Sequence, residues 1–262
     1  MSKVFLLATS LTLLDQSILK LIYKEPLLQI DTSFYPKSSK IVVNNGFALN
    51  YNFYTRTPLW TYEVIMPHID RKKKKIKRPR MFFTDESIPQ QFQLKHNDYT
   101  KSGYSRGHMV PAYNLKYDPE TYDETFKLSN IVPQLQSNNA GVWLDIEDKV
   151  RDFATSGKFD EIHVWTGPIF HYQDGDIIRK IKNKITIPTH LYKVIYLVRR
   201  DKKISFAVII ANNSDNIVYP VSFELLEYLT GLQFPDIIKK DSLKQKHVLC
   251  IGSKPNMWHI KD

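Results

Sequence analysis

Several short stretches of the chain are dense in apolar residues, and each is closed by a proline, a glycine or a charged cluster. Four of them have the β-branched and aromatic composition of strands, namely residues 59–66, 161–166, 191–198 and 204–210. The first ends at Pro67, and the second is expected to stop at Gly167 and Pro168. The last two are joined by a charged turn, which predicts a β-hairpin.

The remaining pattern is less regular. Residues 222–230 predict a short helix that is capped by Ser222 and ends at Gly231. Residues 25–58 are rich in Pro, Ser, Asn and Tyr, and we predict loops there around one short strand at residues 41–43. Because strands and helices are interspersed without regular alternation, the predicted fold class is α+β.

A longer amphipathic pattern begins at Asn139. From there Trp143, Glu147 and Arg151 recur every fourth residue and would share one face of a helix. The adjoining apolar stripe would face the core, and it comprises Val142, Ile146, Val150 and Phe153. Eight helical residues rise about 12 Å, so Asn139 and Glu147 are not expected to contact one ion together.

Residues 1–24 form a separate N-terminal segment. Its apolar run, residues 4–14, is too short to span a bilayer, so we predict no transmembrane anchor. Three interpretations stay open: a secretory signal, an organelle-targeting segment, or an N-terminal helix. The absence of arginine before Arg56 weakens a mitochondrial transit signal. Residues 25–262 show no repeat, heptad pattern or clear linker, and are predicted to form a single domain.

Charge points to the kind of partner. The chain has 37 Lys and Arg residues against 27 Asp and Glu, a net charge of +10, which favours nucleic acid or an anionic membrane surface. Residues 71–80 contain eight basic residues in ten, which indicates either a solvated loop or a direct phosphate contact. The single cysteine, Cys250, excludes an internal disulfide and a Cys-rich zinc site, and we interpret it as a small buried residue.

The candidate chemistry lies between residues 105 and 151. Hydrolysis of a phosphodiester needs an activated water, neutralisation of the charge on the phosphoryl oxygens, and help for the leaving oxygen. Histidine titrates closest to neutral pH, which makes His108 the candidate general base. If the segment is a strand, Arg106 and His108 point to the same side, with Gly107 allowing close approach of the backbone.

Metal binding is predicted from Asn139 and Glu147. Asn139 would supply a neutral oxygen ligand and Glu147 would hold a coordinated water, which suits a hard, largely hydrated ion such as Mg²⁺. Asn130 either positions His108 or a water, or is a turn residue before the next apolar run. Arg151 either contacts phosphate or pairs with Glu147 at i,i+4.

Three segments together, residues 105–112, 128–134 and 139–147, resemble the DNA/RNA non-specific endonuclease family, the ββα-metal or His-Me finger nucleases. The branch most similar is the mitochondrial endonuclease G and exo/endonuclease G type, because Ser105 stands where most of the family has Asp. Further similar segments are residues 166–168, 188–195 and 221–234, and the likeness covers about residues 51–235.

This resemblance implies a mixed, mainly antiparallel central sheet with flanking helices and a ββα-metal motif. For the reaction it implies His108 as general base, Arg106 as the arginine beside it, and Asn130 as the asparagine of a Leu-Ser-Asn motif. For the metal it implies Asn139 as the sole direct protein ligand and Glu147 as the carboxylate that holds the metal's waters. For the substrate it implies Arg151 as a nearby arginine and Arg80 as a further phosphate-binding arginine.

The implied activity is that of a Mg²⁺-dependent, sugar-non-specific endonuclease, with Mn²⁺ as a substitute ion, that cleaves DNA and RNA to 5′-phosphate and 3′-hydroxyl products. The resemblance also implies a homodimer and a mitochondrial location, with secretion as the alternative. Two other activities stay open, a 5′-exonuclease of the mitochondrial type and a non-catalytic binding module, the latter suggested by Ser105. The branch carries a C-terminal helical segment for which there is no room before Asp262, and this puts exonuclease directionality in question.

Overall fold

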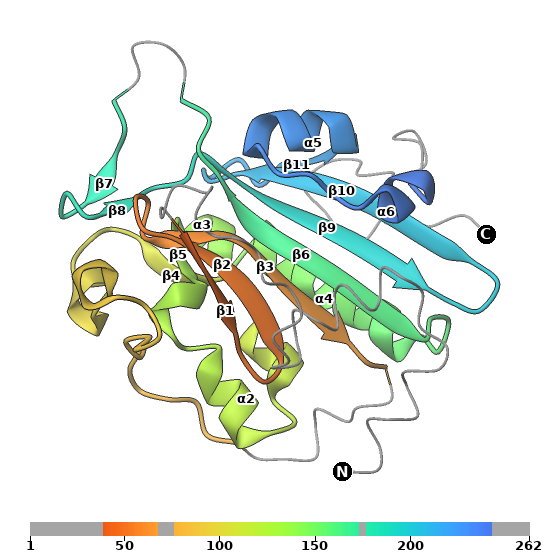
Figure 1. Ribbon diagram of the computed structural model, residues 1–262, viewed down its shortest axis with the longest axis horizontal. Coiled ribbons are helices and arrows are strands. Elements are labelled where there is room, and N and C mark those ends of the chain that lie inside the picture. Colours follow the sequence, from red (N-terminus) through yellow and green to blue (C-terminus); the bar gives the residue numbers. More distant parts are fainter. Residues whose placement is uncertain (1–38, 68–75, 173–176, 243–262) are drawn as a thin grey trace.

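A seven-stranded sheet forms the centre of the computed structural model, which describes residues 39–67, 76–172 and 177–242 (Figure 1). In spatial order its strands are β1 (Ser39–Val43), β2 (Phe47–Asn52), β3 (Thr57–Ile65), β6 (Glu161–Ile169), β9 (His190–Val198), β10 (Lys203–Ala211) and β11 (Val218–Val221). The α+β class is confirmed. The expected mainly antiparallel character of the sheet is confirmed, and each of its neighbouring pairs is antiparallel.

Helices cover both faces of this sheet (Figure 1). Helix α4 (Val142–Thr155) packs on one face, and α5 (Phe223–Thr230) and α6 (Asp236–Lys240) pack on the other. The smaller elements are the paired strands β4 (Ser105–His108) and β5 (Ile131–Gln134), the paired strands β7 (Lys180–Ile181) and β8 (Ile185–Thr186), helices α2 (Pro119–Glu124) and α3 (Gln136–Asn139), and the 3-10 helices η2 (Gln90–Phe92), η3 (His96–Tyr99), η4 (Ala112–Leu115) and η5 (Leu128–Asn130).

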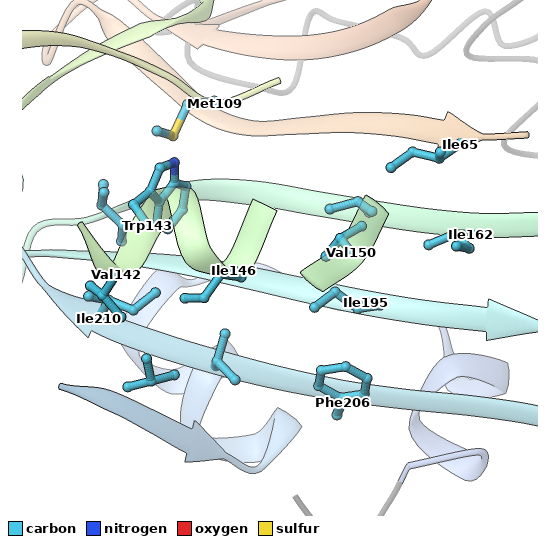
Figure 2. Close-up of a cluster of buried hydrophobic side chains, with 14 of the residues drawn as sticks. Ile65, Met109, Val142, Trp143, Ile146, Val150, Ile162, Ile195, Phe206 and Ile210 are labelled. Atoms are coloured by element: carbon cyan, nitrogen blue, oxygen red, sulfur yellow. The ribbon is translucent and has the colours of Figure 1, made fainter. Parts of the chain in front are cut away.

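The main core lies between α4 and the sheet (Figure 2). Trp143, Ile146 and Val150 of the predicted helical region are buried against strands β6, β9 and β10. Met109, which follows β4, packs into the same cluster as Trp143. The core therefore joins the helix, the sheet and the chain just after β4 into one unit.

Two predicted elements are confirmed with small shifts of their ends. The hairpin of residues 191–198 and 204–210 is the pair β9 and β10, which are antiparallel from Lys203 opposite Val198 to Ala211 opposite His190. The capped helix is α5, where the Ser222 side chain accepts a hydrogen bond from the Leu225 backbone N–H at 3.2 Å. Gly231 ends α5 with a φ of 68°, a left-handed conformation that glycine adopts without steric cost.

Strand β2 was missed within the region predicted as loops. Its sequence, Phe-Ala-Leu-Asn-Tyr-Asn, contains two asparagines, which are depleted in strands and hide the pattern. The strand forms because β1 and β3 pair with it on both sides. Its side chains Phe47, Leu49 and Tyr51 are buried in a second core with Ile88 and Leu115.

Strand β6 was expected to stop at Gly167 and Pro168 but continues to Ile169. Pro168 lies opposite Leu191 of β9, whereas the register with β3 ends at Thr166 opposite Thr61. A proline is tolerated there because β6 no longer pairs with β3 at this position, so the missing N–H costs no hydrogen bond to β3.

The predicted single helix from Asn139 is in fact two helices, because α3 ends at Asn139 and α4 begins at Val142. Gly141 between them has φ −106° and ψ −121°, and a Cβ there would clash with the backbone oxygen of Ser137. Glycine thus permits the break. Residues 1–24, the first half of the basic run (residues 71–75) and Cys250 lie outside the described residues.

Replacing Ile146 by Ala should lower the free energy of unfolding by about 2–5 kcal/mol, because this side chain is 0% exposed and its loss leaves a cavity between α4 and the sheet. Urea denaturation measures the change. Leu144 of the same helix is 41% exposed, and Leu144→Ala is the matched control, expected to change stability by about 0.5 kcal/mol or less. Equal losses for both variants would contradict this assignment of the core.

Candidate active site

The two strands β4 and β5 hold the central histidine and arginine. They are antiparallel, with His108 opposite Ile131 and Arg106 opposite Pro133. A Cβ at Gly107 would clash with the side-chain oxygen of Gln134, so the pair can approach this closely because residue 107 is glycine. The segment around His108 is a strand, which is the condition under which Arg106 and His108 were expected to point to one side, and β4, β5 and the helix that follows form the expected ββα arrangement.

His108 lies in an aromatic surround. Its ring centroid is 5.4 Å from that of Phe82 and 5.1 Å from that of Phe126, which meets it edge to face. Its Nε2 atom is buried and has no hydrogen-bond partner among the described residues. Burial and the positive charge of Arg78 lower the pKa of His108 to about 3. The imidazole is therefore neutral at physiological pH, the form that accepts a proton.

Arg106 meets the same aromatic ring from its own side. Its guanidinium carbon lies 5.5 Å from the centroid of Phe82 and 5.7 Å from that of Tyr99, and Nη2 donates to the backbone oxygen of His96 at 2.9 Å. Burial lowers the pKa of Arg106, but an arginine stays charged near neutral pH. Since Arg106 and His108 both contact Phe82, the two side chains lie on one side of β4, as alternation predicts.

Asn130 is fully buried and bonded to backbone. Its Oδ1 accepts from the Val110 N–H at 2.9 Å, and its Nδ2 donates to the carbonyl oxygens of Val110 and Thr125, each at 3.0 Å. The backbone N–H of Met109 donates to the Asn130 carbonyl at 3.0 Å. These contacts fix the chain directly after His108, so the side chain acts on the site through the backbone.

A second arginine near His108 is Arg78, which the sequence reasoning did not single out. Its guanidinium carbon is 4.8 Å from the centroid of the Phe126 ring, and its charge contributes to the low pKa of His108. Arg80, the residue named in the sequence analysis, is exposed, as is Arg78. Both arginines belong to the same basic run, and their spacing in the sequence does not indicate which of them lies near His108.

Asn139 ends α3 and differs from its neighbour Asn138. The buried Asn138 amide accepts from Gln134 Nε2 at 2.5 Å and donates to the Ala211 carbonyl oxygen at 3.1 Å. The half-buried Asn139 amide makes no hydrogen bond to another described residue. Across the described ranges there is no group of three or more His, Cys, Asp or Glu residues that could hold a metal. This donor set fits a hard ion that keeps most of its waters on one amide oxygen.

Glu147 belongs to a buried group of charges between α4 and the sheet. Its side chain is 12% exposed, and its Oε2 lies 3.9 Å from Nη1 of Arg151. Burial raises the pKa of Glu147 to about 7, while the positive charges of Lys193 and Arg151 oppose that rise. Lys193 is fully buried in β9, donates to Oγ1 of Thr166 at 2.8 Å and lies 4.7 Å from the Trp143 ring centroid.

Arg151 connects this group to η4. It pairs with Glu147 and also with Asp148, and its Nη1 donates to Oδ1 of Asn114 at 3.4 Å. Nδ2 of Asn114 in turn donates to both carboxylate oxygens of the buried Glu63, at 3.0 and 3.1 Å. The pairing of Arg151 with Glu147 is thus present. Sequence reasoning missed Lys193 and Glu63, since each lies within a strand whose alternation gives no sign of a charged core.

The family model of the DNA/RNA non-specific endonucleases matches residues 29–241. The chain belongs to this family. It is therefore a nuclease of hydrolytic type, and the predicted family is confirmed.

Named relatives agree with this membership. Human "Endonuclease G, mitochondrial" is 30% identical over 234 residues, which cover 84% of this chain and 77% of that protein. "Nuclease 1, mitochondrial" from Schizosaccharomyces pombe is 31% identical over 228 residues, covering 79% of this chain and 70% of that protein. "Nuclease EXOG, mitochondrial" from Xenopus laevis is 34% identical over 243 residues, covering 84% of this chain but 65% of that protein.

A solved structure shares the fold of this protein. A crystal structure of an EndoG/EndoGI complex superposes with a TM-score of 0.67 and 31% sequence identity, and the match covers 74% of this chain and 84% of the other. In the described part of the chain, no helix is both long and apolar enough to cross a membrane.

Replacing Glu147 by Gln should change how stability depends on pH when a chelator is present. The folded chain binds the Glu147 proton more tightly than the unfolded chain does, so this contribution to stability is complete below pH 4.5 and is lost as the pH rises through about 7. The wild type should therefore lose, relative to Glu147→Gln, on the order of 2–3 kcal/mol between these limits. Urea denaturation at a series of pH values measures it.

Asp145 is an exposed carboxylate on the same helix, and Asp145→Asn serves as the control for this measurement. Its stability curve should run parallel to that of the wild type across the same pH range. A parallel curve for Glu147→Gln as well would show that folding does not raise the pKa of Glu147, and would contradict the prediction.

Proposed function

We propose that this protein is a Mg²⁺-dependent, sugar-non-specific endonuclease that hydrolyses the phosphodiester bonds of DNA and RNA. The observation that carries the proposal is the neutral His108, whose buried Nε2 has no partner among the described residues. Its ring contacts Phe82, over which Arg106 lies, and Phe126, over which Arg78 lies. A base with two cations around it suits a reaction that takes a proton from water beside an anionic phosphate.

In this mechanism His108 takes a proton from the water that attacks phosphorus in line with the leaving 3′ oxygen. Arg106 offsets the charge that grows on the phosphoryl oxygens, and Arg78 and Arg151 bind neighbouring phosphates. Asn139 would hold the metal ion and Glu147 would orient its waters; when bound, the ion supplies Lewis-acid stabilisation of the developing negative charge. The leaving 3′ oxygen takes a proton from a water molecule, so the products carry a 5′ phosphate and a 3′ hydroxyl.

The wider biology is proposed from the relatives. The three relatives compared above all carry "mitochondrial" in their names, which supports a mitochondrial location for this protein. We propose residues 25–262 as a single nuclease domain that acts as a homodimer, preceded by a targeting segment in residues 1–24. Mn²⁺ is expected to replace Mg²⁺, since it also favours oxygen ligands.

Replacing His108 by Ala should abolish nicking of a supercoiled plasmid in Mg²⁺, with a loss of about 10²–10⁴-fold in rate, because the attacking water loses its base. Binding to DNA in chelator should stay within about threefold of the wild type, since it depends mainly on phosphate electrostatics. Cleavage and gel-shift assays measure the two effects. His171 is an exposed histidine outside the site, and His171→Ala should nick at the wild-type rate.

The outcomes of the plasmid assay separate the competing activities. If His108→Ala loses binding and cleavage together, His108 is structural and the proposed base is wrong. If the wild type degrades linear DNA but never nicks a closed circle, the protein is a 5′-exonuclease, because an exonuclease needs a free end. If the wild type binds DNA but cuts neither form, the chain is a binding module.

Replacing Asn139 by Ala should raise the Mg²⁺ concentration for half-maximal cleavage by at least about tenfold, because the protein ligand of the metal is lost. The free energy of unfolding should stay within about 0.5 kcal/mol, since this amide has no hydrogen bond to another described residue. Asn138→Ala is the matched variant. It should lower stability by roughly 1–3 kcal/mol through lost hydrogen bonds. If Asn138→Ala raised the Mg²⁺ requirement and Asn139→Ala lowered the stability, Asn139 would be excluded as the ligand.

A further inference from the structure

Tyr113 is an exposed aromatic side chain on a rigid support. Its ring is 42% exposed, while the other three residues of η4 are buried, namely Ala112, Asn114 and Leu115. The chain leading into η4 is fixed, because Asn130 bonds both the backbone N–H and the carbonyl oxygen of Val110. An exposed tyrosine is usually free to move, but the backbone that carries this one is held by the same residue that fixes the chain after His108.

A cation lies against this ring. The guanidinium carbon of Arg151 is 5.2 Å from the Tyr113 ring centroid. Arg151 also donates to Asn114 at 3.4 Å and lies 3.9 Å from Glu147, so its own position is set from three sides. The contact between the cation and the ring orients the ring. It also places an aromatic surface directly beside an arginine that the proposed mechanism assigns to phosphate binding.

We infer that Tyr113 is a stacking platform for a nucleobase next to the cleaved phosphodiester, an inference that rests on the proposed nuclease function. A nucleic-acid strand presents a phosphate and a base on each nucleotide. With one phosphate bound at Arg151, the attached base reaches the neighbouring ring of Tyr113. Every base has a π-face, so this contact selects against a missing base without selecting among the four bases. It also makes no use of the sugar 2′ hydroxyl, which suits an enzyme that accepts both DNA and RNA.

Tyr219 offers a matched control elsewhere on the protein. Its side chain is 48% exposed, close to the value for Tyr113, and it lies on β11 opposite Ile209 of β10. Its neighbour Val218 packs in the core beneath α4, so alternation along the strand directs Tyr219 to the opposite face of the sheet. Loss of this ring removes a similar exposed aromatic surface on the face of the sheet opposite α4.

The test is cleavage of an end-labelled single-stranded oligonucleotide with one abasic residue, compared at every linkage with the intact oligonucleotide. The wild type should cut roughly 5- to 100-fold more slowly at a linkage in fixed position relative to the abasic residue, because the stacking contact is lost there. Tyr113→Phe and Tyr219→Ala should show the same local drop. Tyr113→Ala should cut the intact substrate slowly and show no further drop at the abasic residue.

Two results would overturn the inference. If Tyr113→Ala keeps the same local drop as the wild type, another group stacks on the base. If Tyr113→Ala loses activity by the same factor at every linkage, the one affected by the abasic residue included, and its melting temperature falls, the ring serves only to pack against Arg151. Failure of the wild type to cut the intact oligonucleotide in Mg²⁺ would instead contradict the proposed nuclease function, so the two failures are distinguishable.

Discussion

Helix α4 can hold Glu147 and Arg151 in place because its apolar side is buried against the seven-stranded sheet. Ile146 and Val150 pack on β6, β9 and β10, and Trp143 continues the contact toward Met109, directly after β4. Close packing of this kind transmits position, since interiors have few voids into which a side chain can shift. The same contact therefore sets the height of Glu147 above the sheet and the distance between α4 and the strand that carries His108.

Burial also sets the charge state of the two groups that titrate at the site, and it acts on them in opposite directions. Taking a group out of water disfavours its charged form, so the pKa of His108 falls to about 3 and that of Glu147 rises to about 7. The surroundings then differ. His108 lies near the cation of Arg78, which favours the neutral form further, whereas Glu147 lies near Lys193 and Arg151, which favour its ionisation. One physical effect thus yields a neutral imidazole at His108 and a carboxylate at Glu147 whose ionisation Lys193 and Arg151 favour.

The sequence indicated which residues are candidates for the site, but it could not indicate all the side chains that surround them in the structure. His108, Arg106, Asn139 and Glu147 stand out because their spacing around a strand and a helix is unusual for a structural role. Arg78 could not be separated from Arg80, since the choice depends on where the loop passes Phe126. Lys193 and Glu63 could not be predicted, because each stands in an apolar strand and its partner comes from an element far away in the sequence. The break between α3 and α4 at Gly141 depends on a close approach to the backbone of Ser137, which the hydrophobic periodicity of the sequence does not indicate.

The division of charge within the site follows from these placements. The proposed base is neutral, and the proposed metal ligand is an amide, so neither brings a charge that a phosphate would oppose. The cations near them are arginines held by rings or carboxylates, Arg106 at Phe82, Arg78 at Phe126 and Arg151 at Tyr113. A surface of this kind attracts a polyanion whether or not a metal is bound, because arginine keeps its charge. In the proposed mechanism the arginines bind the substrate and the metal serves the reaction, so the two functions would rest on different residues of one packed unit.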